Sequence, residues 1–136
     1  MFKEHGSFEI RLQGNVLVLD IHGAWNIETS LAYRDAITTC IKPIVGQEWA
    51  VLTLMNEWEL CTPDSELVIA STVADAITKG LVREAVFNNN GAIKLELFEK
   101  YRKKQNYNKP ETRFKRQVFD NQIDAETWLT QEGFPL

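Results

Sequence analysis

The sequence predicts an α/β domain, in which a mixed, mostly parallel sheet is opened by an antiparallel β-hairpin and flanked by about four helices. Two β-type runs at the N-terminus are separated by a Gly-Asn pair, and later apolar runs alternate with helical patterns. Because parallel strands need long crossover connections, usually helices, this alternation indicates parallel pairing after the hairpin. The length of 136 residues suits one domain, so we expect residues 1–136 to fold as a single unit.

The N-terminal hairpin is predicted from alternation and from its turn. Along Ser7–Gln13 every second residue is apolar, which is typical of a half-buried strand. Residues 15–21 are nearly all apolar, and the Gly14-Asn15 pair between the two runs is typical of a tight turn. We therefore expect the first two strands to pair antiparallel.

The first helix is predicted to begin at Asn26, a good capping residue, with Glu28 in the favourable first turn. Pro43 and Gly46 mark its end. Its apolar face recurs at three- and four-residue steps and comprises Ile27, Leu31, Ile37, Cys40, Ile41 and Ile44. Residues 49–55 then lack polar alternation, which favours a central strand covered on both faces.

The second helix is predicted to start at Thr62-Pro63, with a threonine cap and a proline at the first helical position. Gly80 ends it, residues 81–87 form the next strand, and residues 88–91 form a loop. The face expected to be buried comprises Ile69, Ala70, Val73, Ala74 and Ile77.

The C-terminal part is predicted as helix, strand and helix. A third helix is lined by Ile93, Leu97, Phe98 and Tyr101, and polar residues 105–110 break it. Residues 113–119 alternate, which predicts a strand near the edge of the sheet. Residues 120–133 close the chain with a short helix that carries Ala125, Trp128 and Leu129.

The composition is that of an ordinary globular protein, with 44% hydrophobic and 25% charged residues. The N-terminus lacks the apolar core of a secretory signal, and neither end carries a lipidation motif. The longest apolar runs are far shorter than the ~20 residues that a membrane span needs. We therefore expect a cytoplasmic protein with no membrane span.

The charge is uneven, because basic residues crowd into residues 100–116 together with Tyr101 and Tyr107. Such a stretch can suit nucleic acid or anionic headgroups. The isoelectric point of ≈ 5.2, however, lies well below the value above about 9 that marks a nucleic-acid-binding domain. We expect a solvated helix face and its following loop, and no nucleic-acid partner.

No catalytic or metal-binding pattern stands out. The two histidines, His5 and His22, are far apart in sequence, and the chain has neither an HxxxH nor a CxxC spacing. Cys40 and Cys61 are far apart in sequence, and we interpret them as reduced packing residues. Neither a GxGxxG motif nor a phosphate-loop lysine is present. The sequence therefore predicts no cofactor, no metal site and no enzymatic activity.

Three segments resemble a known family. They are the hairpin of residues 8–23, the run Val51-Leu52-Thr53-Leu54 followed by Asp64-Ser65 at a helix start, and the ending of residues 116–129. Together they resemble the STAS superfamily of sulphate transporters and anti-sigma-factor antagonists, and most closely its SpoIIAA-like branch of bacterial proteins. The resemblance implies this α/β fold and a regulatory, protein-interaction role.

The resemblance also implies a phosphorylation site at Ser65, since in anti-sigma-factor antagonists a partner kinase phosphorylates the serine after the matching aspartate. This chain has Glu66 and Leu67 where the family motif continues with serine and glycine. A phosphate at a helix N-terminus would meet free N–H groups and the positive end of the dipole, although Asp64 and Glu66 would repel it. The simpler alternative is an ordinary third residue of a helix capped by Thr62.

Two functional hypotheses follow. The first is a non-enzymatic interaction module that presents Asp64-Ser65-Glu66 and Trp58 to a protein partner or to a second copy of the chain. The second is a protein for an apolar small ligand or lipid, with a pocket near Trp25, Trp58 and Met55, since we place both tryptophans in loops at strand ends. The same tryptophans could instead close the rim of the core. An enzyme whose site assembles from residues dispersed along the chain is a third alternative.

Overall fold

The computed structural model describes residues 6–88 and 113–136, except for the side chains of residues 56–61. Residues 6–88 follow the order β-β-α-β-α-β, and residues 113–136 add a strand and a helix. The strands are β1 (Ser7–Gln13), β2 (Val16–Trp25), β3 (Trp49–Cys61), β4 (Leu81–Asn88) and β5 (Lys115–Phe119). The helices are α1 (Ile27–Cys40), the 3-10 helix η1 (Lys42–Ile44), α2 (Pro63–Thr78) and α4 (Gln122–Gln131).

The described strands form one sheet of five, in the order β1-β2-β3-β4-β5. β1 and β2 pair antiparallel, from Ser7 opposite His22 to Gln13 opposite Val16. Every other neighbouring pair in this sheet is parallel. The predicted fold class, a mixed and mostly parallel sheet opened by an antiparallel hairpin, is confirmed.

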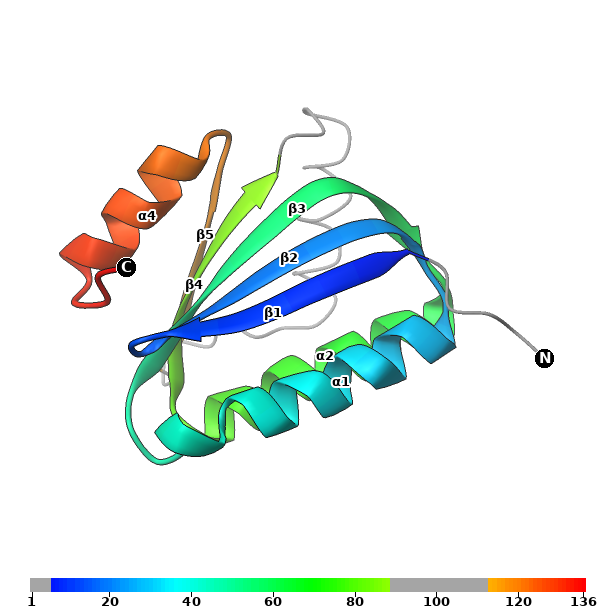
Figure 1. Ribbon diagram of the computed structural model, residues 1–136, viewed down its shortest axis with the longest axis horizontal. Coiled ribbons are helices and arrows are strands. Elements are labelled where there is room, and N and C mark those ends of the chain that lie inside the picture. The colour runs from blue at the N-terminus through cyan, green and yellow to red at the C-terminus, as the bar shows by residue number, and fades with distance from the viewer. Residues whose placement is uncertain (1–5, 89–112) are drawn as a thin grey trace.

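The helices lie on both faces of the sheet (Figure 1). α1 and α2 run side by side against one face, whereas α4 packs on the other face beside β4 and β5. The buried hydrophobic side chains form two clusters, one on each face of the sheet. One contains Leu17 and Trp49 beneath α1 and α2, and the other contains Val18, Leu52 and, from α4, Leu129. β3 is therefore covered on both faces, as its unbroken apolar run predicts.

The two strands that lead into α1 and α2 are longer than predicted. β2 continues past Gly23 to Trp25, and β3 continues past Met55 to Cys61. Their parallel pairing persists to Trp25 opposite Cys61, with register shifts on either side of Gly23. The loops expected around Trp25 and Trp58 are therefore strand. The prediction was wrong because a glycine and several polar residues interrupt the apolar pattern, while the neighbouring strand still supports the pairing.

α1 begins as predicted after Asn26, whose side-chain oxygen accepts a hydrogen bond from the Thr29 N–H. It ends earlier than predicted, at Cys40, and the chain then turns through η1, which contains Pro43. Its buried residues include Thr29 and Ser30, which the hydrophobic pattern did not select. Burial along α1 follows the contact with α2 and the sheet rather than hydrophobicity alone.

α2 begins at Pro63 and ends before Gly80, as predicted. Its buried residues are Ser65, Thr72 and Ala76. The face expected to be buried is displaced from these positions: Ile69, Ala70, Val73 and Ile77 are half-buried and Ala74 is exposed.

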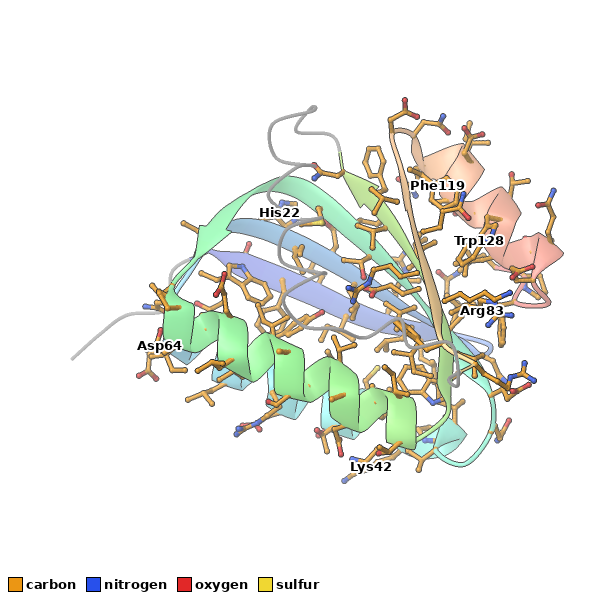
Figure 2. The ribbon with its side chains drawn as sticks, turned by 180° about the vertical axis from the view of Figure 1, so that it is seen from behind. His22, Lys42, Asp64, Arg83, Phe119 and Trp128 are labelled. Atoms are coloured by element: carbon orange, nitrogen blue, oxygen red, sulfur yellow. The ribbon has the colours of Figure 1, made fainter. Side chains whose placement is uncertain are left out.

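The C-terminal part agrees with the prediction where it is described. The third predicted helix lies outside the described residues, and Asn88, expected in a loop, is the last residue of β4. β5 forms an edge of the described sheet. α4 contacts β5 through the Phe119–Trp128 ring pair, with centroids 5.9 Å apart (Figure 2). At its C-terminal end, Glu132 Oε1 forms an ion pair with Arg83 Nε of β4 at 2.8 Å. None of the described helices is long and apolar enough to cross a membrane.

Gly80 joins α2 to β4 at a point where the backbone of residues 46–49 approaches closely. The Trp49 N–H donates to the Gly80 carbonyl at 3.0 Å, and the Trp49 indole N–H donates to the Lys79 carbonyl at 2.9 Å. Gly80 has φ +112°, and a Cβ there would lie 1.9 Å from the Gln47 carbonyl oxygen. Only glycine fits both the backbone conformation and the space.

We expect Gly80→Ala to lower the free energy of unfolding by about 3 kcal/mol or more, because strain and a backbone clash act together. Gly46→Ala is the matched control, since Gly46 has φ +90° and a Cβ added there would meet nothing within 4 Å. It should lose only about 1 kcal/mol from strain. Urea unfolding of both variants measures the difference, and equal losses would contradict the close approach at Gly80.

Candidate functional site

The N-termini of α1 and α2 lie side by side at the carboxyl ends of β2 and β3. Each helix begins one residue after its strand, with Asn26 and Thr62 as the connecting residues. The Thr62 N–H donates to the Trp25 carbonyl at 3.1 Å, which ties the two connections together. Because β2 and β3 are parallel neighbours, both helices must start at the same edge of the sheet.

Two buried serines join the helices at this edge. Ser30 of α1 and Ser65 of α2 both have exposed fractions of 0%, and their hydroxyl groups are hydrogen-bonded to each other. Each hydroxyl also lies 3.2 Å from the Asn26 carbonyl oxygen, to which it can donate. Small hydroxyl side chains let the helices approach closely while satisfying each other's polar groups. Ser65 is therefore part of a joint between helices.

The two helix starts are capped differently. The Asn26 side chain accepts from both the N–H and the hydroxyl of Thr29, each at 3.1 Å. Thr62, expected to cap α2, makes no side-chain capping bond, and its hydroxyl donates instead to Asp64. Asp64 in turn accepts from the Ser65 N–H at 2.9 Å. Hydrogen bonds from the Thr62 hydroxyl and from the backbone N–H groups of Ser65 and Asp64 lower the pKa of the Asp64 carboxyl. This carboxylate therefore stays ionised at the start of α2, where the helix dipole favours a negative charge.

The outer surface of the first turns of α2 is mixed polar and apolar. Asp64 lies at the exposed start of the helix (Figure 2). Leu67, on the next turn, has an exposed fraction of 73%. Ser71 follows on the same side and is exposed, whereas Glu66 is half-buried. Leu67 was not among the predicted site residues. The helical periodicity of α2 nevertheless places it outside the predicted buried face, so the sequence could have indicated its exposure.

The predicted site residues are thus divided between surface and interior. Asp64 reaches the surface and Glu66 reaches it in part, but the Ser65 side chain faces α1. A kinase could reach the Ser65 hydroxyl only if the first turn of α2 moved away from α1. The Trp58 side chain lies outside the described residues, and its backbone pairs with Gly23 in the sheet.

Trp25 and Met55, proposed to line a ligand pocket, belong to the core, and each has an exposed fraction of 2%. The Trp25 ring packs against Phe8 and Tyr33, with centroids 5.7 Å and 4.8 Å away, and these two rings also contact each other. Its indole N–H donates to the His22 carbonyl at 2.9 Å. These contacts correspond to the alternative in which the tryptophan closes the core.

Two hollows are lined by described residues, and neither includes Trp25. A groove of about 270 Å³ runs between α1 and α2, where Arg34 and Thr38 of one helix face Ser71 and Asp75 of the other. A smaller cavity of about 30 Å³, roughly the volume of one water molecule, lies between the helices and the sheet near Tyr33. Neither has the size of an enclosed pocket for a small organic ligand.

A buried ion pair lies on the sheet face that carries α1 and α2. Arg116 Nε and Glu84 Oε1 are 2.6 Å apart, and the Thr53 hydroxyl donates to Glu84 Oε2 at 2.6 Å. The exposed fractions of the Arg116 and Glu84 side chains are 5% and 10%. Arg116 therefore does not contribute to a solvated basic surface, in contrast to the prediction for residues 100–116. Arg113 is exposed and pairs with Glu48 at 3.0 Å, and residues 100–112 lie outside the described part of the chain.

Tyr33 is buried close to this pair. Burial raises the pKa of the Tyr33 phenol, the negative charge of Glu84 raises it further, and Arg116 opposes both effects. The phenol therefore stays neutral in the folded protein at pH values where an exposed tyrosine ionises.

The histidine and cysteine side chains that are described show no metal or catalytic grouping. His22 Nε2 lies 2.9 Å from Asp20 Oδ1, and His5 lies outside the described residues. Cys40 is half-buried against the core, and burial raises the pKa of its thiol, which makes it a weaker nucleophile. Over residues 6–88 and 113–136, no three His, Cys, Asp or Glu side chains gather as metal ligands would.

Two solved structures are similar to this chain over nearly its whole length. A protein of the DUF3478 family from Shewanella loihica, described as uncharacterised and as having a SpoIIAA-like fold, superposes with a TM-score of 0.68 at 14% sequence identity. That match covers 95% of this chain and 97% of the other. An anti-sigma factor antagonist from Mycobacterium paratuberculosis superposes with a TM-score of 0.57 at 14% identity, over 92% of this chain and 94% of the other.

No protein-family model and no curated protein matches the chain. At 14% identity the two structural matches show the fold. The SpoIIAA-like fold that the sequence resemblance predicts is thereby confirmed.

We expect Ser65→Asp to destabilise the protein by about 3 kcal/mol, because it places an uncompensated charge in the buried joint with Ser30. Ser65→Ala should lose only about 1 kcal/mol. Ser71→Asp is the matched control, an exposed serine on the same helix, and should stay within about 0.5 kcal/mol of the parent. Chemical unfolding measures the stability of all three variants. Similar unfolding midpoints for Ser65→Asp and Ser71→Asp would contradict the burial of Ser65 against Ser30.

The raised pKa of Tyr33 makes stability depend on alkaline pH. Below the pKa of about 10 that tyrosine has in the unfolded chain, both states keep the proton and this contribution is fully present. As the pH rises above about 10, only the unfolded state releases the proton, so stability falls by up to about 1.4 kcal/mol per pH unit. Tyr33→Phe should remove this part of the decline. Urea unfolding between pH 8 and pH 11 tests it, and parallel declines for both proteins would refute it.

Proposed function

We propose that this chain is a non-enzymatic regulatory module that binds a protein partner through the exposed start of α2. The proposed surface comprises Asp64, Glu66, Leu67 and Ser71, which we call the α2 surface. The proposal also includes Trp58, which the sequence predicts to face the partner together with Asp64-Ser65-Glu66. The module needs no cofactor, and we propose that it acts in the cytoplasm.

The exposure of Leu67 carries the proposal. A leucine with an exposed fraction of 73% on the outward side of a helix leaves most of its apolar surface in contact with solvent. With Asp64 and Glu66 beside it, it supplies an apolar contact framed by acidic groups, a pattern of apolar centre and polar rim common in interfaces. A partner with a small apolar pocket and basic residues around it would fit this surface.

The likeness to an anti-sigma factor antagonist supports the same proposal at the level of the fold. A protein of that description acts by engaging another protein. The joint between Ser30 and Ser65 would hold the α2 surface in a fixed position relative to α1, which lowers the entropy lost when a partner binds.

Ser65 enters the proposal as a control point. A phosphoryl group adds about −1.5 to −2 charge and cannot remain in the buried contact between Ser30 and Ser65. Phosphorylation would therefore separate the N-termini of α1 and α2 and change the α2 surface. It would also require that the joint open first, so access to Ser65 would be limited by the local stability of the first turn of α2.

The alternative, an apolar ligand near Trp25, Trp58 and Met55, has less support. A ligand there would have to displace Trp25 from Phe8 and Tyr33 and so open the core. We favour the interaction module for that reason.

The test compares proteins captured by the chain and by two matched variants from a lysate of its own host. Leu67→Arg should abolish capture of the partner, because a charge replaces the apolar contact. Ile123→Arg, at an α4 position with an exposed fraction of 75%, makes an equivalent change on another surface and should leave capture intact. Binding lost in both variants, or in neither, would contradict a partner site on the α2 surface.

A further inference from the structure

Among the described strands, none pairs with the outer edge of β1. Within residues 6–88 and 113–136, β1 pairs with one strand, β2, and in Figure 1 it is the dark-blue strand at the front of the sheet. Proteins usually protect such edges with proline, a bulge, a very short strand or charged side chains, and of these β1 has the charged residues Glu9 and Arg11. β1 has seven residues in unbroken register with β2 and contains no proline. This edge is therefore competent to pair with another strand.

The hairpin determines which backbone groups face that edge. The two-residue turn Gly14-Asn15 is flanked by the pair Gln13 and Val16, the position that closes a tight hairpin with hydrogen bonds. In an antiparallel ladder, residues alternate between pairs that exchange hydrogen bonds and pairs that do not. The odd-numbered residues of β1 thus direct their N–H and C=O groups to β2, and the even-numbered residues direct theirs outward.

We propose that two copies of this chain pair antiparallel through β1, with a twofold axis at Ile10. Ile10 then faces Ile10 of the second copy, and Phe8 faces Leu12 of the second copy. These are the even-numbered residues on both strands, so each facing pair can exchange hydrogen bonds. The pairing continues the sheet from one copy into the other.

The charges of β1 complement each other in this arrangement. Glu9 faces Arg11 of the second copy, and Arg11 faces Glu9 of the second copy. Both residues are exposed in the single chain, where Glu9 lies opposite the carboxylate of Asp20 in β2. Facing residues that do not exchange hydrogen bonds have the closest side chains in an antiparallel pair, so opposite charges there are favourable. The second copy thus places an arginine opposite Glu9.

The same charges disfavour the neighbouring registers. Moving the axis to Glu9 would place Glu9 against Glu9, and moving it to Arg11 would place Arg11 against Arg11. Like charges directly opposite each other are destabilising. If one copy shifted by a single residue, even-numbered residues would face odd-numbered ones. The outward N–H and C=O groups of one copy would then meet groups that point toward β2 in the other, and side chains from opposite faces of the sheet would be paired. The axis at Ile10 is the register that satisfies backbone and charge together.

The other face of β1 adds an apolar contribution. Phe8, Ile10 and Leu12 are half-buried against the core beneath α1 and retain accessible surface. Pairing at the edge would cover part of that surface with the same residues of the second copy. A single seven-residue strand makes a small interface, so we expect a reversible dimer at protein concentrations on the order of 10–100 μM.

Native mass spectrometry and light scattering at about 100 μM protein test the proposal with charge reversals. Glu9→Arg and Arg11→Glu should each be monomeric, because each creates two like-charge pairs. Mixed together they should form a heterodimer, since one chain then carries arginine at both positions and faces a chain that carries glutamate at both. The double variant E9R/R11E should dimerise like the parent.

Glu126→Arg, which changes the charge by the same amount on α4, is the control and should leave the dimer intact. Circular dichroism establishes that each variant is folded. A monomeric parent, single variants that dimerise as well as the parent, or a mixture that yields no heterodimer would each overturn the proposal. Leu67→Arg should dimerise normally, so the α2 surface and the β1 edge are tested separately.

Discussion

The parallel pairing of β2 with β3 is the constraint on which the rest of the structure depends. Because the strands run in the same direction and each leads into a helix after one residue, α1 and α2 must begin at the same edge of the sheet. They then run side by side in the same direction, although parallel helix dipoles repel each other. The pairing therefore requires interactions at the helix starts that compensate for bringing two positive ends together.

Those interactions are local and polar. Asn26 caps α1, Asp64 places an ionised carboxylate at the start of α2, and the Ser30 and Ser65 hydroxyls share the Asn26 carbonyl. A larger side chain at either serine would separate the helices, and an apolar one would leave a polar partner unsatisfied. The small hydroxyl residues thus explain how two helix N-termini pack closely with both hydroxyl groups buried.

The two surfaces for which we propose binding roles lie apart in the fold. The outward side of α2 carries Leu67 among polar residues, whereas the open edge of β1 carries alternating charges. The two proposed surfaces lie on different elements, so binding of a partner at one would leave the other open to a second copy. The buried pair of Glu84 and Arg116, held by Thr53, contributes to neither surface and instead joins β3, β4 and β5 on the covered face.

The sequence by itself determined the class and order of the described elements, because alternation, capping residues and glycines act over a few neighbouring positions. It also determined that Glu9 and Arg11 share one face of β1, because side chains alternate between the two faces of a strand. Only the tertiary structure decided that Ser65 faces Ser30, that Trp25 and Met55 fill the core, that Arg116 is paired inside, and that β2 and β3 continue past their apolar runs. Each of these depends on a contact between residues distant along the chain, which no local pattern records.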